Sequence, residues 1–255
     1  MDLVLSKSIL LAEKLSLNPS NQFTRRIDKL AEDITIKEIE KSGINTYLIS
    51  EEIGEVVIGK GEIEIFIVLD PVDGTRNAVN GIPFFSSSIA LGKYKDNISI
   101  NDVDIGYVRD IYNGNSFWAL KGEGAFENNN KLETFNKTDL ENSLVSIYAY
   151  RNLNAIEKYQ KLALNAKIRT LGSQALELCY VASGKLDACI DLRGISRVVD
   201  TAAAKLILEE SGGIFYILDQ KDQKMSLKNA KGFSFIATPN ERFLKGLIEF
   251  LDNQN

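Results

Sequence analysis

Histidine is absent from this sequence of 255 residues, and its absence excludes several large classes of hydrolase. Ser-His-Asp and Cys-His mechanisms need an imidazole as general base, and many zinc hydrolases need it as a metal ligand. Any hydrolytic chemistry in this chain must therefore use carboxylates, hydroxyl groups, lysine or metal-bound water.

Cysteine, clustered positive charge and long apolar runs are also scarce. Cys179 and Cys189 are the only cysteines, which is typical of a reducing compartment rather than of a disulfide scaffold. The net charge is −5, with lysine and arginine spread along the chain, so we expect no nucleic-acid partner. No apolar run approaches the roughly 18 residues of a membrane span, and the first residues lack the basic head of a signal peptide. We therefore expect a cytoplasmic protein without a membrane partner.

Hydrophobic periodicity predicts a mixed α/β (or α+β) protein with layered helices and sheets. A polar loop at 17–22 separates the first two predicted helices, and turn residues predict a type I′ turn at Asn113-Gly114 and a reversal at 128–130. We expect one unit, 1–255, in which two closely packed halves, 1–145 and 146–255, can be distinguished. The predicted helices are 2–16, 26–41, 154–166, 173–183, 200–211 and a C-terminal amphipathic helix; the predicted strands are 46–49, 62–69, several within 84–150, 167–170, 186–191 and two more near the end.

The most informative segment is Asp70–Thr75, DPVDGT, which directly follows the apolar run Ile65–Leu69. That run is typical of a buried strand, so Asp70 is expected at the carboxyl end of the strand and Asp73 in the following turn. Two neighbouring carboxylates repel each other unless a cation holds them, and Mg²⁺ prefers such oxygen ligands. If Gly74 and Thr75 open a helix, their N–H groups form an anion site. The segment predicts metal and phosphate bound together, although Asp-Pro and Asp-Gly are also ordinary turn dipeptides.

Other acids occupy similar positions. Glu51-Glu52 follows a predicted strand, and ligands of open α/β sheets gather beyond the carboxyl ends of strands. Asp200 precedes a small-residue helix, and Asp28 lies in an amphipathic segment. Each has a structural alternative: a solvated acidic turn for Glu51-Glu52, a plain helix N-cap for Asp200 and an ordinary surface acid for Asp28.

In combination, these motifs resemble the inositol monophosphatase family of Mg²⁺-dependent, Li⁺-sensitive phosphatases. The resemblance includes DPVDGT, the acids at 51–52 and 200, and the segments Gly172–Cys179 and Glu209–Gly213. It covers nearly the whole chain and is greatest for archaeal-type members that hydrolyse both fructose 1,6-bisphosphate and inositol phosphates. It implies a layered αβαβα sandwich and, from resemblance alone, a homodimer.

The resemblance also implies the metal ligands. Glu51, Asp70 and the carbonyl of Val72 would bind one Mg²⁺, and Asp70, Asp73 and Asp200 would bind a second. A third, weaker ion would rest on Glu51 and water. Mn²⁺ is expected to substitute for Mg²⁺, and Li⁺ is expected to inhibit.

The remaining implied roles concern water and substrate. Thr75, with Glu51, would orient and help deprotonate the attacking water, and Asp28 would support the site through water. Gly74 and Thr75 would donate backbone N–H groups to the phosphate. Asp73 and Gln174 are further expected substrate contacts, and the loop before Asp28 would close over the metals. This chemistry is physically adequate without histidine, because paired metal ions can activate water and phosphoryl transfer needs mainly positioning and charge neutralisation.

Three arginines bear on substrate choice. Arg193 stands where inositol-preferring members have an acid, and Arg197 and Arg169 are expected to face the same site. Cationic forks suit a second phosphate better than a hydroxyl group, although each arginine can equally be a surface or ion-pair residue. The arginines favour a bisphosphate substrate.

The sequence therefore predicts a phosphomonoesterase that hydrolyses fructose 1,6-bisphosphate, a step of gluconeogenesis, and also inositol monophosphates. The enzymatic alternatives are an inositol monophosphatase and a 3′-phosphoadenosine nucleotide phosphatase. A regulatory binding protein of the transcription machinery is the alternative from another class.

Overall fold

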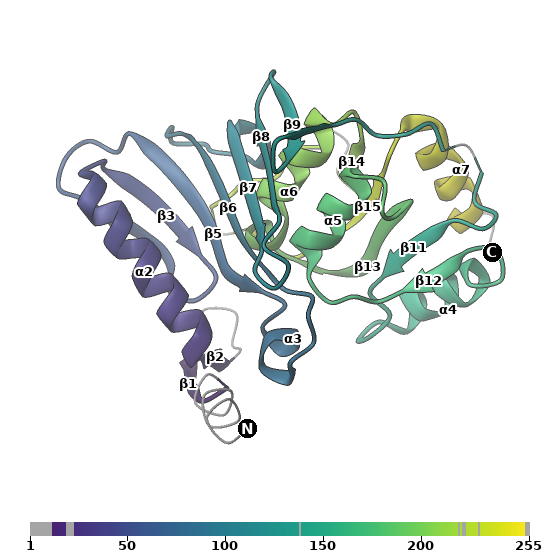
Figure 1. Ribbon diagram of the computed structural model, residues 1–255, viewed down its shortest axis with the longest axis horizontal. Coiled ribbons are helices and arrows are strands. Elements are labelled where there is room, and N and C mark those ends of the chain that lie inside the picture. The colour runs from purple at the N-terminus through teal and green to yellow at the C-terminus, as the bar shows by residue number, and fades with distance from the viewer. Residues whose placement is uncertain are drawn as a thin grey trace.

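Sheets and helices alternate in five layers in the computed structural model, which describes residues 12–18, 23–137, 139–218, 220, 223–228 and 230–252. Helix α2 (Arg26–Ser42) covers the outer face of one sheet, and helices α5 (Gln174–Ala182) and α6 (Val198–Glu210) lie between the two large sheets (Figure 1). Helices α4 (Leu153–Leu162) and α7 (Glu241–Asp252) cover the far sheet. This order confirms the αβαβα sandwich. None of the helices in the described ranges is both long and apolar enough to cross a membrane.

The first large sheet carries the predicted site segments. Its interior strand β5 (Ile65–Asp73) is parallel to β3 (Thr46–Ser50) and antiparallel to β6 (Ser86–Lys93), so β3 and β5 run toward the same edge of the sheet. Its order is β10 (Asn130–Leu132), β9 (Gly124–Glu127), β8 (Ser116–Leu120), β7 (Ile105–Asp110), β6 (Ser86–Lys93), β5 (Ile65–Asp73), β3 (Thr46–Ser50) and β4 (Gly54–Ile58).

The second large sheet is mixed. Strand β11 (Leu144–Ile147) is parallel to both of its neighbours, whereas β15 (Phe233–Thr238) is antiparallel to both of its neighbours. The first sheet ends at Leu132 and the second begins at Leu144, near the predicted division of the chain. That residues 1–255 form a single unit with two closely packed halves stays a prediction. The order of the second sheet is β12 (Lys167–Arg169), β11 (Leu144–Ile147), β13 (Ala188–Ser196), β15 (Phe233–Thr238) and β14 (Ile214–Ile217).

Apolar burial explains the layering. Helix α6 is buried along nearly its whole length, as expected for a helix with a sheet on either side. Helix α2 is amphipathic and packs Ile39 against Leu48, Ile67 and Leu69. Side chains of α4 and α7 form a third cluster on the far sheet. Strand β5 is therefore covered on both faces, which matches its continuous apolar run.

Several sequence predictions need correction. Residues 14–17 form strand β1 (Lys14–Leu17), paired antiparallel with β2 (Phe23–Arg25), where a helix at 2–16 was predicted; tertiary pairing overrides the helical spacing. Residues 2–11 of that predicted helix, and 19–22 of the predicted loop, lie outside the described residues. Helix α6 begins two residues before Asp200, which is therefore in the first turn and not at the N-cap.

The two turn predictions have different outcomes. The reversal at 128–130 is confirmed, with Asn128 at φ 54° between β9 and β10. The predicted type I′ turn is wrong, because of its two central residues only Gly114 has positive φ. The Asp110 carboxylate accepts the backbone N–H of Asn113 at 2.9 Å and organises a wider loop.

Candidate active site

Glu51 and Asp70 are neighbours because β3 and β5 are parallel. Ser50 is paired with Leu69, and the N–H of Glu51 donates to the carbonyl of Leu69 at 3.2 Å. Glu51 and Asp70 are the residues that come directly after this pair, so they lie at the same level of the sheet. The expectation that Glu51 and Asp70 lie side by side on neighbouring strands is therefore met.

A bulge in β5 shapes the DPVDGT segment. Asp70 is opposite Ser88 and Asp73 is opposite Ser86, so three steps on β5 match two on β6. Pro71 cannot donate to a strand partner, and the N–H of Val72 turns to Asp70 Oδ1 at 3.0 Å. Strand β5 thus continues to Asp73, whereas the sequence predicted a turn after Asp70.

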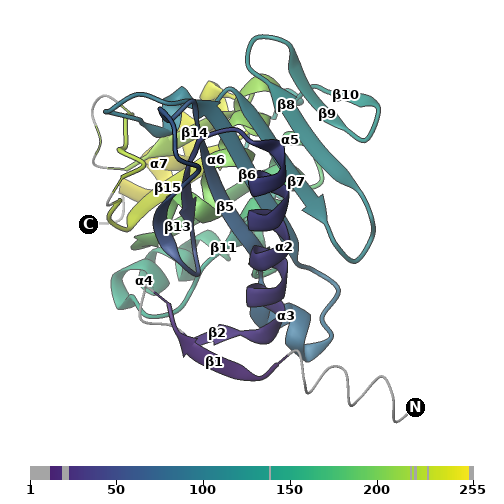
Figure 2. The same ribbon diagram turned by 90° about the vertical axis from the view of Figure 1, so that its left-hand side faces the viewer.

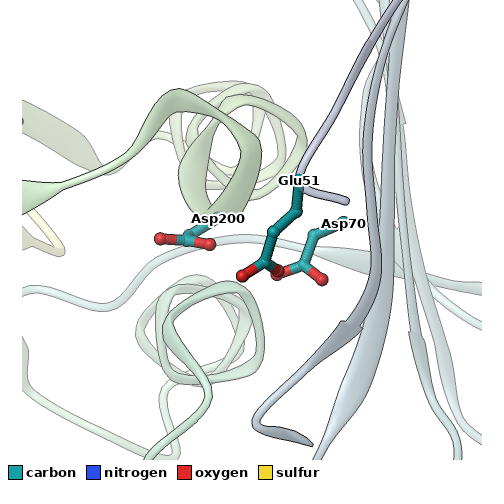
Figure 3. Close-up of side chains that lie close together, drawn as sticks. All are labelled: Glu51, Asp70 and Asp200. Atoms are coloured by element: carbon teal, nitrogen blue, oxygen red, sulfur yellow. The ribbon is translucent and has the colours of Figure 1, made fainter. Parts of the chain in front are cut away.

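Asp200 approaches these acids from the first turn of α6. Carboxylate oxygens of Glu51, Asp70 and Asp200 lie within 4.8 Å of one another. Figure 3 shows Glu51 and Asp70 side by side, with Asp200 directed toward them from the helix. Three elements far apart in the sequence therefore bring three carboxylates to one point.

Asp70 is the centre of this cluster. Its Oδ2 is buried and has no hydrogen-bond partner in the described part of the chain. Burial, followed by the charges of Glu51, Asp73 and Asp200, raises the pKa of Asp70 well above its usual range. An unpartnered carboxylate oxygen beside two other carboxylates fits a hard divalent cation. This donor set can hold such an ion.

Asp73 lies outside the three-acid cluster but close to it. Its Oδ2 accepts the Ser173 hydroxyl at 2.6 Å and the N–H of Ala175 at 2.7 Å. Burial and then the charge of Asp200 raise the pKa of Asp73 to about 8. The start of α5 thus orients Asp73, a contact that the sequence did not reveal, and its role as a metal ligand stays a prediction.

Gly74 is the N-cap of the short helix α3 (Thr75–Asn80), which meets the condition that the sequence analysis set for an anion site at Gly74 and Thr75. Gly74 has φ +88°, and a Cβ there would lie 3.1 Å from the carbonyl oxygen of Gly172, so only glycine fits. The Thr75 hydroxyl is 3.0 Å from Asp28 Oδ1 and 2.9 Å from the carbonyl of Val72. A hydroxyl has one proton, so it donates to one of these acceptors at a time.

Asp28 is buried against Thr75, so the surface-acid alternative does not hold. It lies in the first turn of α2, and its Oδ2 accepts the N–H of Arg25 at 3.0 Å. Burial is the largest cause that raises the pKa of Asp28 to about 6, and the charge of Glu51 adds to it. Figure 2 shows α2 lying across the sheet, with the β1–β2 pair at its N-terminal end near α3.

Glu32, one helical turn after Asp28, is a further site residue that the sequence analysis missed. It is fully buried, and its Oε1 accepts the Ser50 hydroxyl at 2.5 Å and the N–H of Ile53 at 3.2 Å. These bonds bracket Glu51 on both sides. The i, i+4 spacing of Asp28 and Glu32 on one face of α2 was the available signal.

Glu177 is a second missed residue, which supports the other side of the site. Its carboxylate accepts the Ser146 hydroxyl at 2.7 Å, the backbone N–H groups of Leu171 (2.9 Å) and Gly172 (3.2 Å), and the Tyr148 hydroxyl. Burial raises its pKa. The carboxylate fixes the loop whose Gly172 carbonyl closely approaches Gly74.

Arg197 binds the clustered acids instead of standing free. Its Nη1 donates to Glu51 Oε1 at 2.6 Å, and its Nε and Nη2 donate to the two oxygens of Asp200 at 3.0 and 2.7 Å. The sequence placed Arg197 among substrate contacts. In this structure its fork is engaged by two of the predicted metal ligands.

Arg193 is also engaged within the chain. Its Nε and Nη2 donate to Asp191 at 2.9 and 2.6 Å, and its guanidinium packs against the rings of both Tyr148 and Tyr150, at 4.6 and 4.2 Å from their centroids. The side chain is only 6% exposed. Gln174 donates to the same Asp191 at 2.7 Å. The expected free fork at Arg193 is not observed.

Arg169 is the third arginine. It lies exposed on edge strand β12, and its Nη1 donates to the carbonyl of the preceding residue, Ile168, at 2.8 Å. Among the described residues, Arg169 makes no hydrogen bond or ion pair with Glu51, Asp70 or Asp200. Substrate contacts of Arg169, Gln174, Arg193 and Arg197 stay predictions.

Comparison with known proteins identifies the class of protein. Residues 4–253 match the model of the inositol monophosphatase family. The chain is 39% identical over 200 residues to a fructose-1,6-bisphosphatase/inositol-1-monophosphatase of Methanothermobacter thermautotrophicus, covering 75% of this chain and 70% of that protein. It also resembles the solved structure of a Pyrococcus horikoshii protein described as having similarities to inositol-1 monophosphatase. That match has a TM-score of 0.79 and 28% identity, covering 97% of this chain and 90% of the other. The chain belongs to the inositol monophosphatase family.

Another relative is much longer than this chain. It is the bifunctional NADP phosphatase/NAD kinase of Methanococcus maripaludis, which is 37% identical over 246 residues. The match covers 91% of this chain but 43% of that relative. The chain therefore spans less than half the length of this relative.

Proposed function

We propose that this chain is a Mg²⁺-dependent phosphomonoesterase that hydrolyses fructose 1,6-bisphosphate to fructose 6-phosphate and phosphate, and also inositol monophosphates. The observation that carries the proposal is the buried Oδ2 of Asp70, which has no hydrogen-bond partner among the described residues and lies beside Glu51 and Asp200. Arg197 pairs with Glu51 and Asp200 but not with this oxygen of Asp70, so the cluster keeps excess negative charge that a divalent cation would neutralise. A cation held there could also neutralise the charge of a phosphoryl group during its transfer.

Glu51, Asp70 and Asp200 would hold the metal, with the carbonyl of Val72 and the carboxylate of Asp73 as the further ligands implied by the family resemblance. When bound, divalent cations in such a site neutralise phosphate charge and lower the pKa of water. Two to three ions per site, replacement by Mn²⁺ and inhibition by Li⁺ belong to the proposal.

The chain's own groups would orient the reactants. Asp28 accepts from the Thr75 hydroxyl, so that hydroxyl is held at one position at the start of α3. With Asp28 as its acceptor, Thr75 can fix the orientation of an attacking water and pass a proton toward the carboxylate. The backbone N–H groups of Gly74 and Thr75 would bind the phosphate.

A relative described as a fructose-1,6-bisphosphatase/inositol-1-monophosphatase supports a bisphosphate substrate, whereas the contacts of Arg193 do not. The two donors that would grip a second phosphate are already bonded to Asp191. NADP is a second candidate substrate, because a relative 37% identical to this chain is a bifunctional NADP phosphatase/NAD kinase.

Phosphate release from a panel of substrates tests the proposal. The panel contains fructose 1,6-bisphosphate, inositol 1-phosphate, NADP and 3′-phosphoadenosine 5′-phosphate, each with Mg²⁺, with EDTA, and with Mg²⁺ plus Li⁺. The highest kcat/KM for fructose 1,6-bisphosphate supports the first candidate, and the highest value for NADP supports the second. A cytoplasmic, homodimeric enzyme of gluconeogenesis is the cellular form of the first candidate.

A regulatory role with the transcription machinery is the alternative from another class. Substitution Asp70→Asn separates the two classes, because a binding role does not need the metal ligands. Full biological activity of that variant would favour the binding role.

A further inference from the structure

Arg197 is a cation that the chain itself places on the clustered carboxylates. Its guanidinium donates three hydrogen bonds to Glu51 and Asp200, at 2.6, 2.7 and 3.0 Å. We propose that Arg197 competes with the metal ion for Glu51 and Asp200 and thereby sets the metal affinity of the site. The inference rests on the proposed metal-dependent function and names the control of that same site.

The geometry of the fork carries the argument. Nε and Nη2 bind the two oxygens of Asp200, so this carboxylate is engaged in the paired mode that guanidinium groups favour. Nη1 binds Oε1 of Glu51 with the remaining side of the same group. A divalent ion that uses these oxygens must share or displace the guanidinium donors.

Charge acts in the same direction as geometry. The ion pairs are only partly exposed, at 26% for the Arg197 side chain, 10% for Glu51 and 11% for Asp200. Solvent screening is weak at such positions, so a positive group there repels an incoming cation. A guanidinium group stays protonated throughout the pH range in which proteins are folded, so Arg197 keeps its positive charge. Arg197 therefore lowers the affinity for metal while it holds Glu51 and Asp200 together.

Arg193 provides a matched comparison within the same protein. It makes a similar two-bond fork with Asp191, also through Nε and Nη2. Asp191 is not part of the three-acid cluster. Loss of Arg193 removes a buried ion pair from the same region without freeing a clustered carboxylate.

Metal binding measured without substrate tests the proposal. Isothermal titration with Mg²⁺, and Mn²⁺ binding by electron paramagnetic resonance, are compared for wild type, Arg197→Gln, Arg197→Lys and the control Arg193→Gln. We expect Arg197→Gln to bind metal roughly tenfold more tightly, Arg197→Lys to lie between it and wild type, and Arg193→Gln to match wild type. The proposal is overturned if Arg197→Gln binds metal with the same or lower affinity than wild type. It is also overturned if neither wild type nor Arg197→Gln binds metal.

A second measurement on the wild-type protein covers the case in which Arg197→Gln does not fold. The Nε–H resonance of Arg197, assigned by its loss in Arg197→Lys, is followed during Mg²⁺ titration. We expect it to shift with the midpoint of metal binding, while the Nε–H resonance of Arg193 stays in place. A stationary Arg197 resonance across that midpoint overturns competition. Neither measurement uses turnover, so a failure of the substrate panel would reject the proposed function separately.

Discussion

Asp28 accepts a hydrogen bond from the Thr75 hydroxyl at 3.0 Å, joining the start of α2 to the start of α3. The two residues are 47 positions apart in the sequence. This contact links an acid that resembles an ordinary surface residue to the threonine of DPVDGT.

Substitution Asp28→Asn should reduce kcat about 10- to 100-fold with little change in KM, because the Thr75 hydroxyl loses its carboxylate acceptor. The matched control is Asp33→Asn on the same helix, where the acid is 44% exposed and paired with Lys29. Steady-state kinetics of both variants provide the measurement. Equal effects of the two substitutions would contradict the role of Asp28.

The metal-depleted protein should lose stability as the pH rises from about 5 to about 8.5. The pKa values of Asp28 and Asp73 are raised to about 6 and about 8 in the folded state. The folded protein therefore binds these protons more tightly than the unfolded chain, and the resulting stabilisation is full below about pH 4. It is lost as the pH passes through each folded-state pKa, and each pKa unit is worth about 1.4 kcal/mol.

Thermal unfolding in EDTA across this pH range measures the effect, and excess Mg²⁺ should oppose the loss by binding the ionised carboxylates. A Tm that rises steadily from pH 6 to pH 8.5 in EDTA would contradict the raised pKa values of Asp28 and Asp73.

Substitution Glu177→Ala should lower the free energy of unfolding by about 3 kcal/mol or more. It leaves the Ser146 hydroxyl and the N–H groups of Leu171 and Gly172 without their acceptor in a buried site. Urea unfolding gives the measurement, with the exposed Glu141→Ala as control, expected within about 0.5 kcal/mol of wild type. A loss no larger than that of the control would refute the supporting role.

Substitution Arg193→Gln should lower the free energy of unfolding by about 3 kcal/mol, because it leaves the carboxylate of Asp191 buried without its ion-pair partner. The ratio of rates with fructose 1,6-bisphosphate and inositol 1-phosphate should remain unchanged, since the fork serves Asp191. Urea unfolding and the two rates check this. Selective loss of the bisphosphate rate would instead support the substrate role expected from the sequence.

Local patterns predicted layered helices and sheets and the carboxylates near the ends of two strands, whereas the αβαβα order and the roles of Asp28 and Asp200 came from the family resemblance. The apolar run before Asp70 predicted a strand covered on both faces, and β3 and β5 place Glu51 and Asp70 at one edge. Helix α2 was predicted to within one residue at its end, because its periodicity matches its packing against the sheet.

The missed features depend on contacts that residue type and spacing alone do not specify. Residues Lys14–Leu17 pair with β2, and no local pattern specifies that pairing. Arg193 and Arg197 were interpreted from their charge alone, whereas their contacts with Asp191 and Asp200 depend on the backbone geometry between neighbouring positions. The roles of Glu32 and Glu177 depend on the hydrogen-bond donors around them, most of which come from other parts of the chain.

The metal dependence of phosphate release tests the central claim most directly. Wild type, Asp70→Asn and the exposed-loop control Asp96→Asn are assayed with fructose 1,6-bisphosphate, inositol 1-phosphate and NADP, in EDTA and after Mg²⁺ is restored. We predict release from at least one substrate by wild type and Asp96→Asn with Mg²⁺, none in EDTA, and a rate at least about 1,000-fold lower for Asp70→Asn. Release at the wild-type rate by Asp70→Asn, or undiminished release in EDTA, would contradict the account.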